Sequence, residues 1–412
     1  MPKIFPFKAV RATRDKVGLV VTRSYQSYSK SERNARMKSN PFSFLHIINP
    51  GYKYKKTISG AERYQLVKNR YSDFKEEGTF VQDKNPSIYV YKIIDRDKNV
   101  FMGFIATAGT DDYENSKIKK HEDTLAEKQK IFKEYLKTVK FNAEPVLVTY
   151  PDNALLAKLF KEIAQERAEY EFTTTYRGTH FLWKVDDKRL IKTIQQEMQK
   201  YDCLYIADGH HRSASSFLLQ QDLKKNNPNH TGKEKYNYFM CYFLPESQLR
   251  IHEFNRLVTD LNGLTKEEFL IALDTYFIIE NRHQEYYKPN KKHHFSMYLD
   301  GEFYALQLRK LNYHFSNSLD RLDAQILYNT VFKPILGIYD LSNDKRVDYV
   351  HGKNDMAFIK SKVDAGKFKV GFGLKPATIK QIKAIADQGL IMPPKSTYIE
   401  PKLRSGITIY EY

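Results

Sequence analysis

The stretch Asp208–Arg212, which reads Asp-Gly-His-His-Arg, constrains the fold more than any other part of the chain. An apolar run over residues 203–207 precedes it and a helical pattern over 213–219 follows, which predicts a strand, a tight turn and a helix. Gly209 lets the backbone turn sharply and a ligand approach closely. Because the first N–H groups of a helix point outward and its dipole favours negative charge, the turn is suited to binding an anion.

The side chains of this turn are suited to phosphate chemistry. Arg212 offers a planar guanidinium that can hold two phosphate oxygens, and we expect it to bind phosphate together with Gly209 and His210. We expect Asp208 or His211 to act as a catalytic acid or base. Because Arg212 should be exposed, its replacement should reduce activity and leave stability nearly unchanged. The alternative interpretation is a tight turn with solvated polar side chains.

A second candidate site precedes a predicted helix. Thr124 and Glu127 fit a capping box, which predicts a helix from residue 124 to about residue 140. His121 and Glu122 then lie just before a helix N-terminus, where the dipole favours an ionised carboxylate. We expect His121 to bind phosphate and Glu122 to accept a proton in catalysis. The alternative is that Glu122 caps the helix or forms an ion pair.

A third candidate site lies near the end of the sequence, after Pro393 and Pro394. Lys395, Ser396 and Thr397 present one ammonium and two hydroxyl groups in a row, which suits phosphate or carboxylate oxygens. The segment lacks the glycines of a P-loop. We expect these three residues to bind phosphate, and the alternative is an extended edge with exposed polar side chains.

No metal site is predicted among the histidines. His293 and His294 lie in a strand-like run without neighbouring acidic or thiol ligands. His210 and His211 are adjacent on a turn, so their side chains should point in different directions and not chelate one ion.

The pattern of apolar runs predicts an α/β or α+β fold with mixed sheets, flanking helices and two or three sub-domains. A chain of 412 residues is long enough for that many. We place a basic N-terminal α+β domain at 1–144, a central α/β domain with the Asp208–Arg212 turn at 145–260, and a C-terminal α+β domain at 261–412. The pair Asp300-Gly301 is the strongest hairpin signal in the chain.

Charge and cysteine content limit the partners and the compartment. The net charge is +18, and residues 1–60 hold thirteen Lys and Arg against two acidic residues, a net +11. This bias suggests an anionic partner or a solvated basic face. Nucleic acid is not favoured, because the chain has no helix-turn-helix, zinc finger or basic zipper. Two cysteines in apolar runs, no long apolar segment and no signal core predict a cytoplasmic protein without membrane spans.

Segments along the whole chain resemble the bacterial and archaeal domain-of-unknown-function family 1015; they are 5–9, 40–45, 120–124, 207–212, 335–338, 392–397 and 400–403. The Asp-Gly-His-His-Arg motif is also similar to the phosphate-handling motif of the ParB/sulfiredoxin-like fold, which includes free-serine kinases and nucleotide-binding partition proteins. The resemblance therefore implies a ParB/sulfiredoxin-like element around the turn. Where the family has an early Ala-Pro-Pro-Tyr-Asp-like segment, this chain departs from it and has residues 20–25.

The resemblance also implies an activity, because some members of the family are regarded as serine kinases. The implied function is a small-molecule phosphotransferase with free serine as acceptor. A nucleotide or pyrophosphate would be the donor, and Mg²⁺ could bridge phosphate and carboxylate. Two alternatives stay open. One is a ParB-like regulator that binds a nucleotide or nucleic acid, and the other is an inactive relative that binds a metabolite.

Overall fold

The computed structural model of the chain describes residues 1–351 and 356–412. The fold is α/β with mixed and antiparallel sheets, which confirms the predicted fold class. Contacts divide the chain into two compact units. The first holds residues 1–120, 124–249 and 401–412, and the second holds residues 121–123 and 250–400. The predicted boundary at residue 144 falls inside the first unit, and the three-part division stays a prediction.

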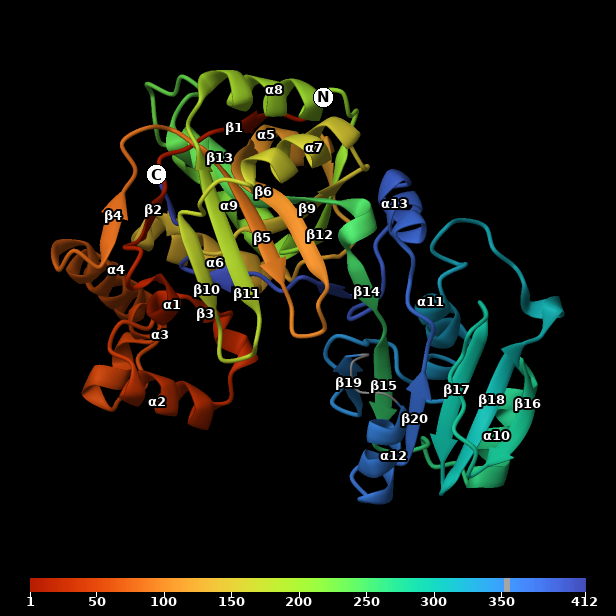
Figure 1. The fold of residues 1–412 in the computed structure, drawn as a ribbon. Helices are drawn as coiled ribbons and strands as arrows, with labels where there is room; N and C mark the ends of the chain where they lie inside the picture. The colour runs from red at the N-terminus through yellow and green to blue at the C-terminus, as the bar shows by residue number, and fades with distance from the viewer. Residues whose placement is uncertain (352–355) are drawn as a thin grey trace. The chain divides into compact units, whose positions relative to one another are not determined.

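A nine-stranded mixed sheet forms the centre of the first unit (Figure 1). Its strands run in the order β10-β11-β5-β6-β13-β9-β12-β7, and β1 pairs with β6. Strand β13 is parallel to β9 and β12 is parallel to β7, whereas the other neighbours are antiparallel. The bounds are β1 Ile4–Phe5, β5 Ile88–Ile94, β6 Val100–Gly109, β7 Ile118–Lys119, β9 Val146–Tyr150, β10 Tyr170–Thr173, β11 Thr179–Val185, β12 Leu204–Asp208 and β13 Tyr238–Pro245.

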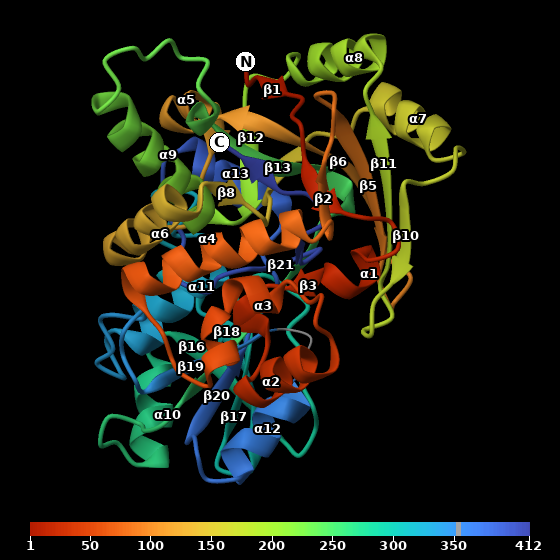
Figure 2. The same cartoon turned by 90° about the vertical axis from the view of Figure 1, so that its left-hand side faces the viewer.

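Helices cover both faces of this sheet (Figure 2). One face carries α7 and α8 and the other carries α6 and α9; their bounds are α6 Ala126–Val139, α7 Ala154–Ile163, α8 Lys188–Met198 and α9 His210–Lys225. Leu156 of α7 and Ile194 of α8 are fully buried in one core cluster with Phe104 of the sheet. Burying such a side chain contributes about 1.5–3 kcal/mol, so the apolar stripes of the helices fix them on the sheet.

Shorter elements complete the first unit. Three two-stranded pairs are β2–β4, β3–β22 and β8–β23. Because β22 and β23 belong to the last dozen residues, the C-terminal segment returns to lie against earlier parts of this unit. The bounds are β2 Val10–Ala12, β3 Thr22–Arg23, β4 Phe80–Gln82, β8 Phe141–Asn142, β22 Arg404–Ser405, β23 Tyr410–Glu411, α1 Val17–Val20, α2 Lys30–Ser39, α3 Leu45–Ile48, α4 Gly60–Glu76 and α5 Thr110–Glu114.

The second unit is built on a six-stranded antiparallel sheet with the order β16-β18-β17-β20-β15-β19. Asp300 and Gly301, with φ of 48° and 80°, join β17 to β18, which confirms the predicted hairpin. Strands β14 and β21 form a separate pair. The bounds are β14 Arg250–His252, β15 Phe254–Val258, β16 Phe277–His283, β17 His294–Leu299, β18 Glu302–Leu308, β19 Val347–His351, β20 Val370–Gly373 and β21 Tyr398–Glu400.

The helices of the second unit are α10 Lys266–Asp274, α11 Asp323–Leu327, α12 Met356–Asp364 and α13 Ile379–Asp387. The apolar pattern over residues 319–336 predicts an amphipathic helix broken near Pro334, but α11 is short and continues only as a π-helical turn over 328–332. The side chain of Asn317 accepts hydrogen bonds from the backbone N–H groups of Leu319 and Asp320, which holds that end as a turn. No helix in the described part of the chain combines the length and apolar character needed to cross a membrane.

Candidate anion-binding turn

The predicted strand-turn-helix is present, with β12 ending at Asp208 and α9 beginning at His210. Gly209 between them has a φ of 103°, a conformation that L side chains rarely adopt. A Cβ atom at Gly209 would also lie 3.0 Å from the guanidinium of Arg212. Glycine is therefore required here for its backbone conformation and for the close packing of Arg212. Having no side chain, Gly209 also cannot cap the first N–H groups of the sixteen-residue helix.

Arg212 is held by three acceptors. Its Nη1 lies 2.8 Å from Glu144 Oε1 and 2.6 Å from the carbonyl oxygen of Pro145, and its Nη2 lies 2.8 Å from Asp208 Oδ2. The side chain is 23% exposed. The expectation of an exposed arginine is therefore wrong, and with it the reason for expecting a small effect on stability, because Arg212 ties the turn to the residues just before β9. Whether it also binds phosphate stays a prediction.

The C-terminal segment closes these contacts into a ring. Lys402 Nζ lies 2.6 Å from Asp208 Oδ1, so the carboxylate of Asp208 has a cation on each oxygen. Ser405 donates a 3.0 Å hydrogen bond to Glu144 Oε2, and Glu144 in turn pairs with Arg212. The turn is thus clamped by residues from two distant parts of the sequence, 144–145 and 402–405.

The two histidines of the turn lie in the first turn of α9. His210 is buried and His211 is half-buried. Ser213 donates a hydrogen bond to the carbonyl of His210, and Ser215 donates one to the carbonyl of His211. The backbone of both histidines is therefore fixed by side chains of the next helical turn.

His121 and Glu122 lie in the connection between β7 and α6. Helix α6 begins at Ala126 with Leu125 as its N-cap and without a side-chain cap, so the predicted capping box by Thr124 is wrong and the helix starts two residues late. Gln129 instead donates hydrogen bonds to the carbonyl oxygen and hydroxyl of Thr124. His121 is buried, and its carbonyl accepts a 2.9 Å hydrogen bond from the N–H of Met392.

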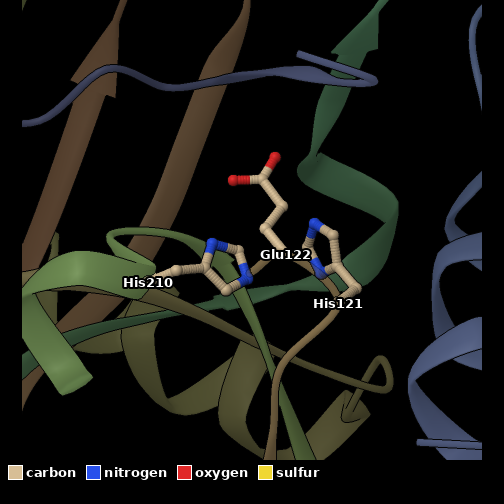
Figure 3. A group of neighbouring side chains, drawn as sticks. All are labelled: His121, Glu122 and His210. Carbon is tan, nitrogen blue, oxygen red and sulfur yellow. The ribbon is translucent and has the colours of Figure 1, made fainter. Parts of the chain in front are cut away.

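Two histidines and a carboxylate lie near one another (Figure 3). One ligand atom each of His121, Glu122 and His210 lies within 4.8 Å of the others. Two imidazole nitrogens and one carboxylate oxygen suit Zn²⁺ or a similar ion better than Mg²⁺, which prefers oxygen ligands. The sequence did not predict this group, because His121 and His210 are 89 positions apart and no local spacing connects them.

The Lys395–Thr397 segment lies in the second unit. Lys395 is exposed with a φ of 55°, and its ammonium lies 5.5 Å from the centroid of the Phe254 ring. Ser396 is buried and donates a 2.6 Å hydrogen bond to the carbonyl of Pro393. Thr397 is also buried, which goes against the alternative of an extended edge with exposed polar side chains. Phosphate binding by the three residues stays a prediction. Ser396 lines a cavity of about 40 Å³ together with the buried Arg256.

Sequence reasoning did not select Glu144, Lys402 and Ser405 as site residues. Lys402 lies in one of the segments that carry the family resemblance, and this was the only feature of the sequence that pointed to it as a site residue. Glu144 and Ser405 reach the turn only through the fold, 64 positions before and 197 positions after Asp208.

The fold and the site together define a class of protein. It is an α/β unit in which a glycine turn begins a long helix and ion pairs hold that turn in place. Residues 4–325 match the family described as a protein of unknown function, DUF1015, and the chain belongs to that family. This confirms the family resemblance, whereas the ParB/sulfiredoxin-like element stays a prediction. No curated protein gives a significant sequence match.

Solved structures give more distant matches. A variant of a free serine kinase in complex with AMP is 12% identical, with 74% of this chain and 92% of that chain covered and a TM-score of 0.39. A conserved hypothetical protein from Pyrococcus furiosus is 12% identical, with coverages of 74% and 94% and a TM-score of 0.37. SbnI with a C-terminal truncation from Staphylococcus aureus is 12% identical, with coverages of 72% and 82% and a TM-score of 0.38. These similarities are too low to support an argument about activity.

Proposed function

We propose that this protein is a small-molecule phosphotransferase acting on a hydroxyl group, with free serine as the acceptor and a nucleotide or pyrophosphate as the donor. One observation carries the proposal. Gly209 opens a sixteen-residue helix in a left-handed conformation, and the two cations Arg212 and Lys402 lie on the carboxylate beside it. Phosphoryl transfer depends mainly on positioning and charge neutralisation, which helix amide groups and fixed cations provide.

Within this proposal the predicted catalytic residues take different roles. Asp208 is ion-paired through both oxygens, so its role in the proposal is to hold Arg212 and Lys402 in place and not to accept a proton. His211, half-buried in the first turn of α9, is the proposed proton acceptor within the turn, and Glu122 is the alternative. His210 and the backbone at Gly209 would contact the phosphate.

The proposed reaction uses Mg²⁺ bound with the phosphate donor. Carboxylate oxygens of the protein and the oxygens of the donor are ligands of the type that Mg²⁺ prefers, and the ion would supply charge neutralisation when bound. The roles of Arg212 and Lys402 do not depend on the ion, because both cations are fixed by protein contacts.

The test is a product screen with the full chain. Purified protein is incubated with serine, threonine or homoserine and with ATP, ADP or pyrophosphate, with and without Mg²⁺, and phosphorylated amino acids are measured by mass spectrometry. We expect phosphoserine from at least one donor. Lys402→Met should lower the rate at least about tenfold, because each 1.4 kcal/mol of lost transition-state stabilisation is a factor of ten. Lys158→Met removes the same charge from an exposed pair on α7 and is the matched control.

Two results would contradict the proposal. The first is the absence of a phosphorylated product with every donor and acceptor. The second is a Lys402→Met variant that works as fast as the parent while Lys158→Met also has no effect.

A binding protein without catalysis is the second candidate, favoured by the double ion pairing of Asp208. Such a protein would bind a nucleotide or a hydroxyl amino acid in calorimetry and release it unchanged. A ParB-like regulator that uses nucleic acid would instead bind oligonucleotides with an affinity that falls steeply as salt increases.

A further inference from the structure

Two arginines of the first unit lie directly opposite each other in a short ladder. Arg23 of β3 pairs with Arg404 of β22 in antiparallel register. Side chains directly opposite in such a ladder lie on the same face with Cβ atoms about 4.5–5.5 Å apart, and like charges placed there repel each other. A third arginine, Arg36 of α2, joins them through the aromatic rings described next.

Tyr28 and Tyr176 hold the three guanidinium groups together. The guanidinium carbon of Arg23 lies 4.3 Å from the ring centroid of Tyr28 and 4.1 Å from that of Tyr176. The carbon of Arg36 lies 5.2 Å from each of the same two centroids, and that of Arg404 lies 6.0 Å from the Tyr176 ring. Stacking uses the faces of a guanidinium and leaves its N–H edges to hydrogen-bond an acceptor.

The positive charge of this cluster is only partly balanced. Among residues 1–351 and 356–412, Glu32 is the one carboxylate within 4.0 Å of Arg23, Arg36 or Arg404, at 3.6 Å from Arg23. Three guanidinium groups and one carboxylate leave a net charge of +2. Nε and Nη2 of Arg23 are buried and have no hydrogen-bond partner in the described part of the chain. Burial, and then the charge of Arg23, lowers the pKa of Arg404.

We propose that Arg23, Arg36 and Arg404 form a binding site for a phosphoryl group, either inorganic phosphate or a phosphate monoester. A phosphoryl group has a charge of about −1.5 to −2 and three acceptor oxygens, which matches the net charge and the unpartnered N–H groups of Arg23. Arg36 already donates a 3.0 Å hydrogen bond to the hydroxyl of Thr175 through one Nη atom. A carboxylate has a single charge and two oxygens and matches less well. Arginine is suited to this role because its planar fork binds two oxygens at once.

The site lies near the turn at Gly209. Lys402 contacts Asp208 and Arg404 belongs to the arginine cluster, and these two residues are two positions apart. Two residues of extended chain span about 6–7 Å. The inference concerns binding alone, so it stands whether or not the protein transfers the phosphoryl group.

The test measures binding of inorganic phosphate to the full chain by calorimetry and by the phosphate-dependent shift of thermal melting. We expect Arg23→Gln, Arg36→Gln and Arg404→Gln each to weaken binding at least about tenfold, the range of a lost charge-assisted contact. Arg189→Gln, which removes the same charge from an exposed position on α8, should bind like the parent. Without phosphate, Arg404→Gln should melt at the same temperature as the parent or higher, because it removes a repulsion.

If Arg404 only stabilised the fold, its replacement would lower the melting temperature without phosphate and would leave phosphate binding unchanged. The proposal is overturned if Arg404→Gln melts lower without phosphate while phosphate binds all variants equally. It is also overturned if Arg189→Gln weakens binding as much as the cluster variants do. Melting without ligand identifies a variant that fails to fold, and Arg36→Gln, on the surface helix α2, then provides the decisive comparison.

A second series distinguishes the source of the phosphoryl group. Inorganic phosphate and O-phosphoserine are titrated separately, together with a short single-stranded oligonucleotide. Tighter binding of O-phosphoserine supports a phosphate monoester, and tighter binding of inorganic phosphate supports the free ion. Binding of the oligonucleotide without measurable binding of either small anion would overturn the proposal in favour of a nucleic-acid surface.

Discussion

Replacing Arg212 by alanine should destabilise the first unit by about 2–4 kcal/mol. Its guanidinium makes two ion pairs at 2.8 Å, with Glu144 and Asp208, and donates to the carbonyl of Pro145. An exposed ion pair contributes about 0–1 kcal/mol, and a hydrogen bond to a charged group about 1.5–3 kcal/mol. The side chains of Arg212 and Glu144 are 23% and 24% exposed, so each of the three contacts should contribute about 1 kcal/mol.

The assay can report on the unit that contains Arg212. Trp183, the single tryptophan of the chain, lies in β11 of the same unit and is buried, so its fluorescence follows the unfolding of that sheet in urea. Arg212→Lys keeps the charge but not the fork, and should lose about half as much stability as Arg212→Ala. Arg189→Ala, at an exposed position on α8, should change stability by no more than about 0.5 kcal/mol.

A double-mutant cycle tests the pairing itself. Combining Arg212→Ala with Glu144→Gln should show a coupling energy of about 1 kcal/mol, because the two side chains are in contact. An Arg212→Ala variant that unfolds at the parent's urea concentration, with zero coupling to Glu144, would refute this reasoning.

Two further predictions concern the backbone and pH. Gly209→Ala should lower the free energy of unfolding by about 1–3 kcal/mol, and by more than Gly78→Ala does. Both glycines have a positive φ, but only at Gly209 would the new Cβ meet a guanidinium. Urea unfolding of the two variants checks this. Burial, and then the charge of Arg404, lowers the pKa of His180 from 6.5 to about 3. Between pH 6.5 and about pH 3 the unfolded chain therefore binds more protons than the folded chain, and the free energy of unfolding falls as the pH falls. The parent should lose about 2 kcal/mol between pH 7 and pH 5 through this residue, and His180→Gln should remove that part of the loss; equal pH profiles would contradict it.

The sequence alone determined those elements that depend only on interactions between residues a few positions apart. The apolar run, the glycine and the helical spacing after Arg212 predicted β12, the turn and α9, because each depends on residues within a few positions. The Asp300-Gly301 hairpin was predictable for the same reason. Thr265 and Glu268 form a capping box at the start of α10, and their spacing is equally local. Thr124 and Glu127 show the limit of such patterns, since the same spacing there does not form a cap.

Only the tertiary structure decided what surrounds the turn. Arg212 looked exposed in the sequence, and the fold brings Glu144 to one side of it and Asp208, held by Lys402, to the other. Likewise, the opposition of Arg23 and Arg404 depends on pairing between strands 381 positions apart. Such contacts form only when burial of the whole apolar core has fixed the order of the strands and the path of the C-terminal segment. The spacing of neighbouring residues in the sequence does not predict that arrangement.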